Sequence, residues 1–251
     1  MSKSELKELK SLHQKKYREL KGKFLVEGDK SVQEAIKSDM AVEEVYAVDS
    51  WAGSELCSSK NIKLDFVTKR ELDSICELKN PNQAVAVMQF PQRQKESISL
   101  NDGWNIFLEK IQDPGNLGTI LRIADWYGIE KILCSPESVE PFNQKVIQSS
   151  MGAVFRVPLR TINTEEFISF AQVADVKLYA TAMKGESIYR EIAEERGILM
   201  MGNEGNGLSS ELLDAADRTV TIPGHGKAES LNVAVATGIL TDWISRSSSG
   251  D

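Results

Sequence analysis

The segment IFLEKIQDPGNLGTILRIADWYGIEKILC, residues 106–134, determines the fold class. It starts with an apolar strand at 106–108, continues into a helix at 117–127 and ends with a second apolar strand at 131–134. Within the helix, an i, i+3, i+4, i+7 stripe predicts the face that packs on a core, formed by Leu117, Ile120, Leu121 and Ala124. A strand, a helix and a second strand in this order are typical of α/β proteins with parallel strands.

The same alternation continues to the end of the chain. Strands are predicted at 178–182, 198–201 and 220–222, and helices at 146–151, 209–216 and 231–245. The last helix is apolar on nearly all sides, so we expect it to be buried all round. Short β-branched strands between helices predict an α/β fold with a mostly parallel sheet covered on both faces. Ligands of such sheets bind beyond the carboxyl ends of the strands.

The first 90 residues predict a smaller α/β domain. A weakly amphipathic helix with Leu6, Leu9, Leu12 and Leu20 is followed by a short apolar run at 24–26. Strands are expected at 45–48, 64–67 and 84–88, and helices at 31–37 and 71–77. Residues 91–97 are polar and open with Pro91, which is typical of a linker. We therefore expect two domains, 1–92 and 98–251.

Composition limits the function classes. The 251 residues are 41% hydrophobic and 27% charged, as in ordinary globular proteins. No apolar run approaches the roughly 20 residues of a membrane span, and the charged N-terminus has no signal-peptide core, so we expect a cytoplasmic protein. Cys57, Cys76 and Cys134 are scattered and the chain has two histidines, which argues against a zinc site and favours buried, unreactive thiols.

The net charge of −7 argues mildly against nucleic acid as a partner. Its distribution points the other way, because residues 1–30 hold nine Lys and Arg against five acidic residues. Taken alone, this segment favours a solvated, charged helix over RNA binding.

Three strand-to-helix junctions carry the candidate chemistry. In the first, Asp-Pro-Gly at 113–115 forms a turn and Asn116 is well placed to cap the following helix. Thr119, Arg122 and Trp126 fall outside the apolar stripe, so Arg122 should project near a helix start, where anions bind. A turn, a cap and a surface arginine remain the alternative.

The second junction, GNEGNG at 202–207, has three glycines in six positions after a buried strand, which lets the backbone approach a ligand closely. Its spacing is neither that of a dinucleotide fingerprint nor that of a phosphate-binding Walker loop. Glu204 could accept hydrogen bonds from an amine, an amide or a hydroxyl. A tight turn followed by Ser209 as a helix cap is the alternative.

The third junction runs from Ile222-Pro223 to Leu231-Asn232, with Ser230 as the expected N-cap of the last helix. His225 lies between two glycines, but a loop histidine is more often solvated than catalytic.

Taken in order, the three junctions resemble the three motifs of the SpoU branch of the SPOUT class of RNA 2′-O-ribose methyltransferases. The matching segments are 113–119 with Arg122, 202–205 with 207–209, and 222–223 with 229–233. Upstream, Arg18 with residues 24–28 resembles the opening of the substrate-binding domain that many members carry. The stretch at 80–83 only loosely matches that domain's Pro-Gln-Gly segment. The resemblance covers nearly the whole chain.

The resemblance implies a C-terminal trefoil knot, a homodimer, S-adenosylmethionine as cofactor, and ribosomal or transfer RNA, not DNA or a membrane, as partner. The backbones of Gly202, Ile222 and Leu231 would hold the cofactor, together with Asn203 and Gly205 of the same loop. The acceptor site would be lined by the five residues Asn116, Arg122, Glu204, Ser230 and Asn232.

Methyl transfer to a hydroxyl needs a positioned oxygen and a place for its proton, and it needs no metal because the donor carries a positive sulfur. The resemblance assigns the base role to Arg122. A guanidinium stays protonated in proteins, so we expect Arg122 instead to hold the adjoining phosphate and stabilise the developing alkoxide. The phosphate or a water then takes the proton. Two other classes remain: an inactive RNA-binding scaffold and a nucleotide-dependent oxidoreductase. Calorimetry with S-adenosylmethionine and a dinucleotide, alongside turnover, separates the three.

Overall fold

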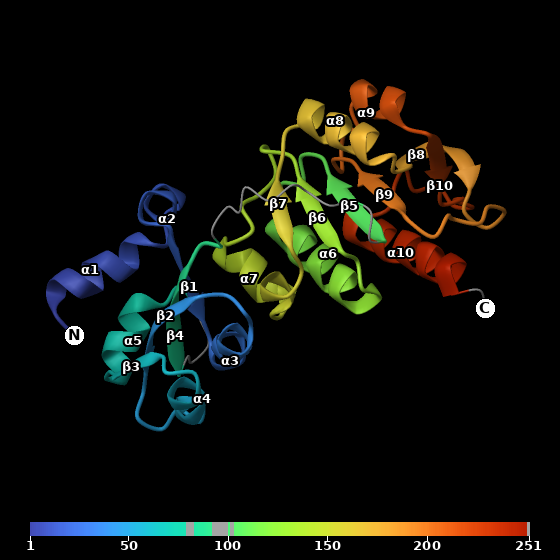
Figure 1. Cartoon of the computed structure of the whole chain (residues 1–251). Coiled ribbons are helices and arrows are strands. Elements are labelled where there is room, and N and C mark those ends of the chain that lie inside the picture. The colour runs from blue at the N-terminus through green and yellow to red at the C-terminus, as the bar shows by residue number, and fades with distance from the viewer. Residues whose placement is uncertain (79–82, 92–99, 101–102, 250–251) are drawn as a thin grey trace. The chain divides into compact units, whose positions relative to one another are not determined.

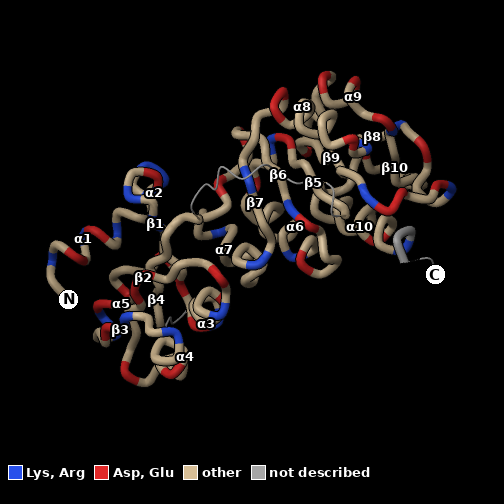
Figure 2. The backbone as a smooth tube through the Cα atoms, in the orientation of Figure 1, with Lys and Arg blue, Asp and Glu red and all other residues tan. Residues whose placement is uncertain are grey.

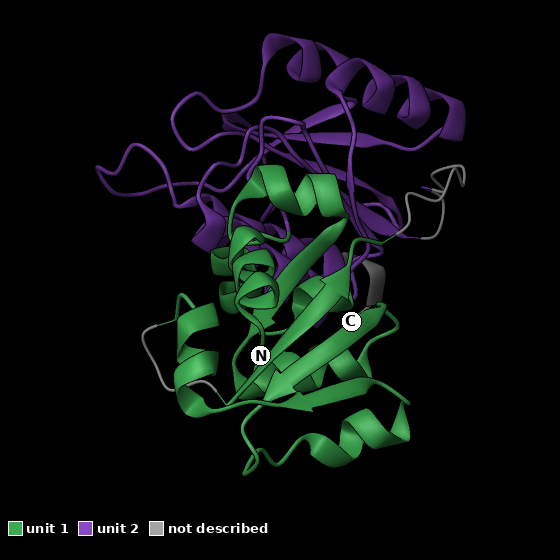
Figure 3. Ribbon diagram, turned by 90° about the vertical axis from the view of Figure 1, so that its left-hand side faces the viewer, with its two compact units in different colours: residues 1–95, 142–156 green, residues 96–141, 157–251 purple. Residues whose placement is uncertain are grey.

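The computed structural model describes residues 1–78, 83–91, 100 and 103–249. The chain forms two compact units, Met1–Lys95 with Phe142–Arg156, and Glu96–Pro141 with Val157–Asp251 (Figure 1 and Figure 3). The two predicted domain ranges are each continuous in sequence, whereas the first unit also contains residues 142–156. Residues 80–82 and most of the predicted linker at 91–97 lie outside the described residues.

The described part of the first unit contains a mixed four-stranded sheet in the order β1-β4-β2-β3. Its strands are β1 (Lys23–Glu27), β2 (Val42–Ala47), β3 (Lys63–Phe66) and β4 (Ala84–Gln89). Its helices are α1 (Lys3–Ser11), α2 (Lys15–Lys21), α3 (Asp29–Lys37), α4 (Ser54–Ser59), α5 (Lys69–Ile75) and α7 (Gln144–Ser150). The three predicted strands are confirmed, and the apolar run at 24–26 forms β1. The short α4 was not predicted, because a single buried residue, Cys57, gives it no periodicity.

The helix predicted at the N-terminus is two helices, because the chain turns between α1 and α2. Arg18 is 5% exposed and donates hydrogen bonds to the carbonyl oxygens of Leu12 at 3.0 Å and His13 at 2.7 Å. Leu9 and Leu12 pack into the core, whereas Leu20 is 74% exposed and contributes nothing to it. Arg18 therefore fixes a turn, and its guanidinium is not presented to RNA.

Glu27, at the end of β1, is a second buried charged residue of this unit. Its carboxylate accepts hydrogen bonds from the backbone N–H groups of Glu77 and Leu78. Burial raises the pKa of Glu27, and the two N–H groups oppose that shift. Like Arg18, Glu27 holds backbone groups of its own unit, so the opening motif of the chain builds the domain itself.

Residues 142–156 join the first unit through an aromatic cluster. The Phe142 ring stacks on Phe24 of β1, with ring centroids 4.3 Å apart, and lies 5.3 Å from the ring of Phe90. Arg156 forms an ion pair with Glu34 of α3 at 2.8 Å. Helix α7 thus has its partners some 120 residues upstream in the sequence.

In the second unit, the described residues form a six-stranded, wholly parallel sheet in the order β10-β8-β9-β5-β6-β7. The strands are β5 (Trp104–Leu108), β6 (Lys131–Cys134), β7 (Leu159–Thr161), β8 (Leu178–Ser187), β9 (Gly197–Met201) and β10 (Arg218–Thr221). The helices are α6 (Pro114–Tyr127), α8 (Thr164–Ala174), α9 (Ser210–Ala215) and α10 (Val233–Ser249). The predicted parallel α/β fold is confirmed, and β7 and α8 are additions to it.

Helices cover both faces of this sheet, as predicted (Figure 1). On one face, Phe167 of α8 stacks on Phe107 of β5 with centroids 4.0 Å apart, and Leu212 of α9 joins the same core. On the other face lie α6 and α10. Two hydrogen bonds show that they run parallel: Asn232 donates to Asn116 at their starts, and Tyr127 at the end of α6 donates to Asp242 in the middle of α10.

The expectation that α10 is buried on all sides is wrong. Thr237 and Thr241 are fully buried, but Val235 is 53% exposed, and Leu231 just before the helix is 47% exposed. Apolar composition predicts burial of a helix, but it does not distinguish the interior of a chain from a surface that another molecule covers.

Cys57 and Cys134 are free and buried, as predicted, and Cys76 is partly buried. Burial raises the pKa of Cys134 to about 12, so this thiol is unreactive at neutral pH. No helix among the described residues is long and apolar enough to cross a bilayer.

Candidate functional site

The site is built at the carboxyl end of β5, where the chain turns into α6. Asp113 is the N-cap of α6, and its carboxylate accepts a hydrogen bond from the backbone N–H of Asn116 at 2.8 Å. The prediction that Asn116 caps this helix is therefore wrong. Pro114 occupies the first turn, where a missing N–H costs nothing, and the Asn116 side chain is left free for other partners.

The glycine loop after β9 is held tightly within itself. Asn203 and Gly207 exchange two backbone hydrogen bonds, and the Asn203 side chain accepts from the N–H groups of Gly205 and Asn206. Gly202 lies so close to the Gly207–Leu208 backbone that an added Cβ would come within 2.2 Å of it. Glycine was expected here so that a ligand could approach the backbone closely. In the structure, Gly202 is required because another part of the loop backbone lies against it.

Three predicted site residues, one from each junction, meet in a chain of hydrogen bonds. Asn116 donates from Nδ2 to Glu204 Oε1 at 2.7 Å, and Asn232 donates from Nδ2 to Asn116 Oδ1 at 2.9 Å. Positions 116, 204 and 232 are far apart in sequence, and the parallel sheet brings them to one edge. We call Asn116, Glu204 and Asn232 the polar triad.

Asn232, and not Ser230, caps the last helix. Its side chain accepts hydrogen bonds from the backbone N–H groups of Ala234 at 3.0 Å and Val235 at 3.3 Å. The helix starts at Val233, two residues later than predicted. Ser230 is exposed in the preceding loop and makes no hydrogen bond to any residue that the structure describes.

The predicted cofactor contacts are main-chain groups, and these groups are free. The backbone N–H and C=O groups of Gly202, Ile222 and Leu231 make no hydrogen bond within the described part of the chain. Gly202 and Ile222 are partly buried, where backbone groups normally find a partner, whereas Leu231 is 47% exposed. Free backbone donors and acceptors at the carboxyl edge of the sheet fit a ligand that hydrogen-bonds to the main chain, such as an adenosyl group.

Arg122 is exposed on α6 and does not contact the polar triad. It lies six residues, about 1.7 turns, beyond Asn116, so its side chain projects from a different side of the helix. Trp126, one turn farther along on the same side as Arg122, is 84% exposed. The stripe of Leu117, Ile120, Leu121 and Ala124 is fully buried, as predicted.

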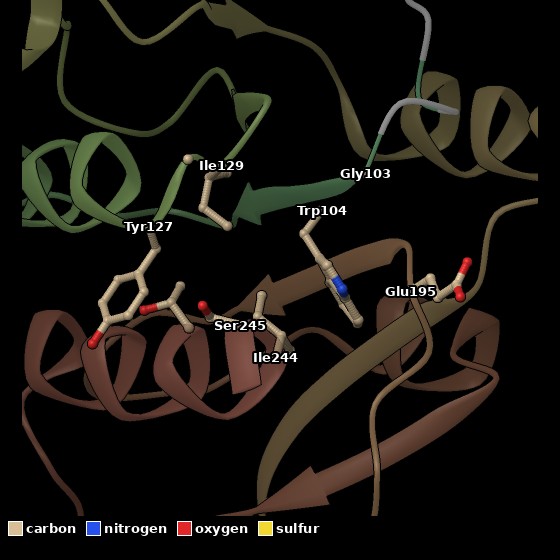
Figure 4. Close-up of a pocket in the computed structure, with 9 residues that line it drawn as sticks. Gly103, Trp104, Tyr127, Ile129, Glu195, Ile244 and Ser245 are labelled. Atoms are coloured by element: carbon tan, nitrogen blue, oxygen red, sulfur yellow. The ribbon is translucent and has the colours of Figure 1, made fainter. Parts of the chain in front are cut away.

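A separate pocket opens at the other end of the same helices (Figure 4). It is lined by Trp104 and Ile129 beside the amino end of the sheet and by Thr241 and Ile244 of α10. Because α6 is 14 residues long, its two ends are roughly 20 Å apart, so this pocket is not part of the site described above. His225 is exposed in the loop between β10 and α10, with no partner among the described residues, in agreement with a solvated histidine.

Sequence reasoning missed Asp113, which caps α6, and Glu109, which is 3% exposed at the end of β5. Asp113 carried a usable signal, since aspartate directly before proline is a common helix start. Glu109 had a weaker one: it directly follows the apolar run 106–108, at the strand end where ligands bind.

Comparisons with known proteins give matches to both parts of the chain. Residues 103–242 match the SpoU rRNA Methylase family model, and residues 3–86 match the MRM3-like substrate binding domain. The chain is 33% identical over 237 residues to the 23S rRNA (guanosine(2553)-2′-O)-methyltransferase RlmP of Bacillus subtilis, covering 94% of this chain and 93% of RlmP.

Solved structures show the same fold. The S-adenosylmethionine-bound rRNA methyltransferase from Sinorhizobium meliloti matches with a TM-score of 0.88 at 30% identity, over 97% of this chain and 95% of that one. The SpoU methyltransferase AviRb from Streptomyces viridochromogenes, also in complex with this cofactor, matches with a TM-score of 0.86, over 98% of both chains. At 23% identity, the second likeness bears on the fold alone.

The fold and the site, with these matches, define an S-adenosylmethionine-dependent RNA methyltransferase. The chain belongs to the SpoU rRNA methylase family.

Proposed function

We propose that this protein methylates a ribose 2′-hydroxyl of ribosomal or transfer RNA at the polar triad. The observation that carries the proposal is the hydrogen-bond chain from Asn232 through Asn116 to Glu204, which joins the three motifs. The triad orients the Glu204 carboxylate, and a carboxylate accepts a hydrogen bond from a hydroxyl. The exposed Ser230, two residues before Asn232, offers a further hydroxyl to the same substrate.

S-adenosylmethionine supplies a methyl group that is already activated by its positive sulfur. The free main-chain groups of Gly202, Ile222 and Leu231 would hold the adenosyl part, and Asn203 and Gly205 would keep the loop in shape around it. The role of the protein is then to hold the ribose oxygen in line with the methyl group, which lowers the barrier by several kcal/mol, and to stabilise the charge that develops on that oxygen.

The proposal is tested by methylating total ribosomal RNA and transfer RNA with a methyl-labelled cofactor, followed by alkaline hydrolysis. Alkali cleaves RNA through the 2′-hydroxyl, so a methylated ribose leaves an uncleaved dinucleotide. We expect label in dinucleotides from one of the two RNA pools. Label in mononucleotides would mean that a base is methylated, and the proposed acceptor would be wrong.

For the first unit we propose an RNA-binding role, supported by its match to a substrate-binding domain. Basic and acidic residues alternate along α1 and α2 (Figure 2), and Lys15, Lys21 and Lys23 form ion pairs with glutamates. Four other lysines of α1 and α2, and one of α3, form no ion pair among the described residues and would meet RNA phosphates: Lys3, Lys7, Lys10 and Lys16, and Lys30.

We also propose a homodimer formed through the face of α6 and α10 that carries exposed apolar side chains. Trp126 is 84% and Val235 53% exposed, and tryptophan is the residue type most enriched at the energetic centres of interfaces. Because Arg122 lies one turn from Trp126 on the same side of α6, the proposed dimer would bring Arg122 to the interface. A guanidinium that lies away from the triad of its own chain is then available to RNA crossing the dimer.

Replacing Trp126 by glutamate should weaken the dimer at least about 30-fold, the effect of losing a central interface tryptophan. Sedimentation over a range of concentrations measures this effect. Val173→Glu is the matched control, because Val173 is 88% exposed on α8, on the other face of the sheet. A Trp126→Glu protein that stays as dimeric as the Val173→Glu protein would exclude this face.

The remaining parts of the proposal concern topology and location. The chain leaves β10 at one edge of the sheet, yet α10 packs beside α6, which follows the central strand β5. Residues 222–232 therefore cross from the edge to the middle of the sheet, which supports a trefoil knot. We propose a cytoplasmic location, where the RNA substrates of this enzyme class are found.

A further inference from the structure

The end of strand β5 holds both ends of the glycine loop. Glu109 accepts a hydrogen bond on Oε2 from the backbone N–H of Ser209, at 2.7 Å, and donates from its own backbone N–H to the carbonyl oxygen of Met201, at 2.9 Å. Met201 precedes the loop and Ser209 follows it. Glu109 is 3% exposed, so its carboxylate is committed to this contact and is not available to substrate.

The next residue, Lys110, supplies a third contact. Its backbone is left-handed, with φ of 56°, which a lysine adopts only at some cost in free energy. Its carbonyl oxygen accepts a hydrogen bond from Nδ2 of Asn203 at 3.0 Å. Its ammonium group lies 3.7 Å from Glu109 Oε1 and offsets the buried negative charge.

Ser209 depends on this contact. It precedes α9 as the N-cap, but its side chain makes no capping hydrogen bond, and its hydroxyl has no partner among the described residues. The hydrogen bond from its N–H to Glu109 is therefore the polar contact that fixes the exit of the loop. Between entry and exit lie Gly202, with its free main-chain groups, and Glu204 of the polar triad.

We propose that Glu109 is a positioning residue, which sets the affinity for S-adenosylmethionine by fixing the glycine loop through Ser209. The inference rests on the proposed cofactor contact of that loop. Displacing a loop by about 1 Å is enough to spoil a preorganised site. The length of the Glu109 side chain, which brings its oxygen to the N–H of Ser209, matters more for holding the loop than its charge does.

Two substitutions separate reach from charge. Glu109→Gln keeps an oxygen at the same distance and loses the charge, whereas Glu109→Asp keeps the charge and is one methylene too short. By calorimetry with S-adenosylmethionine, we expect the dissociation constant to rise at least about 10-fold in Glu109→Asp and less than about 3-fold in Glu109→Gln. A reversed order would overturn the proposal.

Substitutions of Asp217 control for a general loss of stability. Asp217→Asn is compared with Glu109→Gln, and Asp217→Ala with Glu109→Ala. The Asp217 carboxylate also accepts from a backbone N–H, that of Leu178 at 2.9 Å, and also pairs with a neighbouring lysine, Lys177. It lies at the amino end of β8, away from the loop. Both alanine variants should melt at lower temperature, but only Glu109→Ala should lose cofactor affinity. Equal losses in the two would make Glu109 merely structural.

Cofactor binding by the parent and by Gly202 variants separates the positioning role of Glu109 from the assignment of the glycine loop as the cofactor site. If the parent binds the cofactor tightly and the Glu109 variants do too, the positioning role is wrong and the cofactor site stands. If Gly202 variants of the parent also bind normally, the assignment of the loop itself is wrong.

Discussion

Replacing Arg122 by alanine should slow methyl transfer at least about 10²-fold, the scale seen when a charge-stabilising donor is lost. The stability of the fold should change little, because the side chain is exposed and makes no hydrogen bond or ion pair within the described chain. The expected effect follows from the role we give the guanidinium, which holds an RNA phosphate and stabilises the negative charge developing on the ribose oxygen.

Single-turnover methylation of a substrate RNA measures the rate of methyl transfer. Cofactor titration measures affinity, and melting curves measure stability. Arg246→Ala is the matched control, because Arg246 is a similarly exposed arginine on α10 that pairs with Asp242 one turn earlier. We expect Arg246→Ala to behave like the parent in all three. Arg122→Lys should recover little activity, because a point charge does not replace a planar fork that spans phosphate and ribose oxygens.

Two results would contradict this account. A large fall in melting temperature that parallels the loss of rate would make Arg122 a structural residue. Near-normal turnover of Arg122→Lys would mean that positive charge alone suffices. If instead Trp126→Glu and Arg122→Ala lose the same fraction of activity while both keep cofactor affinity, the guanidinium acts across the dimer.

The parallel sheet could be predicted from the sequence because it depends on local patterns, whereas the grouping of Asn116, Glu204 and Asn232 was implied by the resemblance to the SpoU family. Apolar runs followed by turn residues mark where strands end, and strand ends of a parallel sheet share one edge. Strand ends therefore indicated the edge where ligands bind, but the resemblance supplied Asn232, in a set that also held Arg122 and Ser230. The hydrogen-bond order of the polar triad, with Asn116 in the middle, depends on side-chain directions that no spacing gives.

Both helix caps near the site were predicted at the wrong residue, by two or three positions. At each start, two polar residues compete: Asp113 and Asn116 for α6, Ser230 and Asn232 for α10. The helix begins where the cap has an extended backbone and its side chain reaches the first N–H groups. Pro114 favours the earlier residue in α6, and packing of α10 against α6 favours the later one in α10, which is a tertiary effect.

Contacts between distant parts of the sequence could not be predicted from local patterns. The ring of Phe142 packs with Phe24 and Phe90, and nothing local to residues 142–156 indicates that they belong with the first unit. For the same reason, a chain beginning near residue 98 would leave α7 without its partners. Charge-reversing substitutions of Lys7, Lys10 and Lys16 are therefore a cleaner test of RNA binding than truncation.

Replacing Gly202 even by alanine should weaken cofactor binding at least about 10²-fold, and valine should abolish it. From the sequence, a side chain here was expected to obstruct the approach of the cofactor. The structure gives a stronger reason: a Cβ on Gly202 would lie 2.2 Å from the carbonyl carbon of Gly207 and 2.3 Å from the nitrogen of Leu208. These are backbone atoms, so no side chain can rotate aside, and the loop itself must open.

Opening the loop breaks the paired hydrogen bonds between Asn203 and Gly207 and shifts Glu204, so cofactor affinity and the polar triad should fail together. Gly226→Ala is the control, because Gly226 lies in the loop before Ser230 with no atom within 4 Å of an added Cβ. Cofactor titration should give a parent-like dissociation constant for Gly226→Ala. Overpacking should lower the unfolding free energy of Gly202→Ala by about 1–3 kcal/mol, leaving a folded protein to titrate. Tight cofactor binding by a folded Gly202→Ala protein would show that the loop tolerates a side chain, and the cofactor would then have to be placed elsewhere along the carboxyl edge of the sheet.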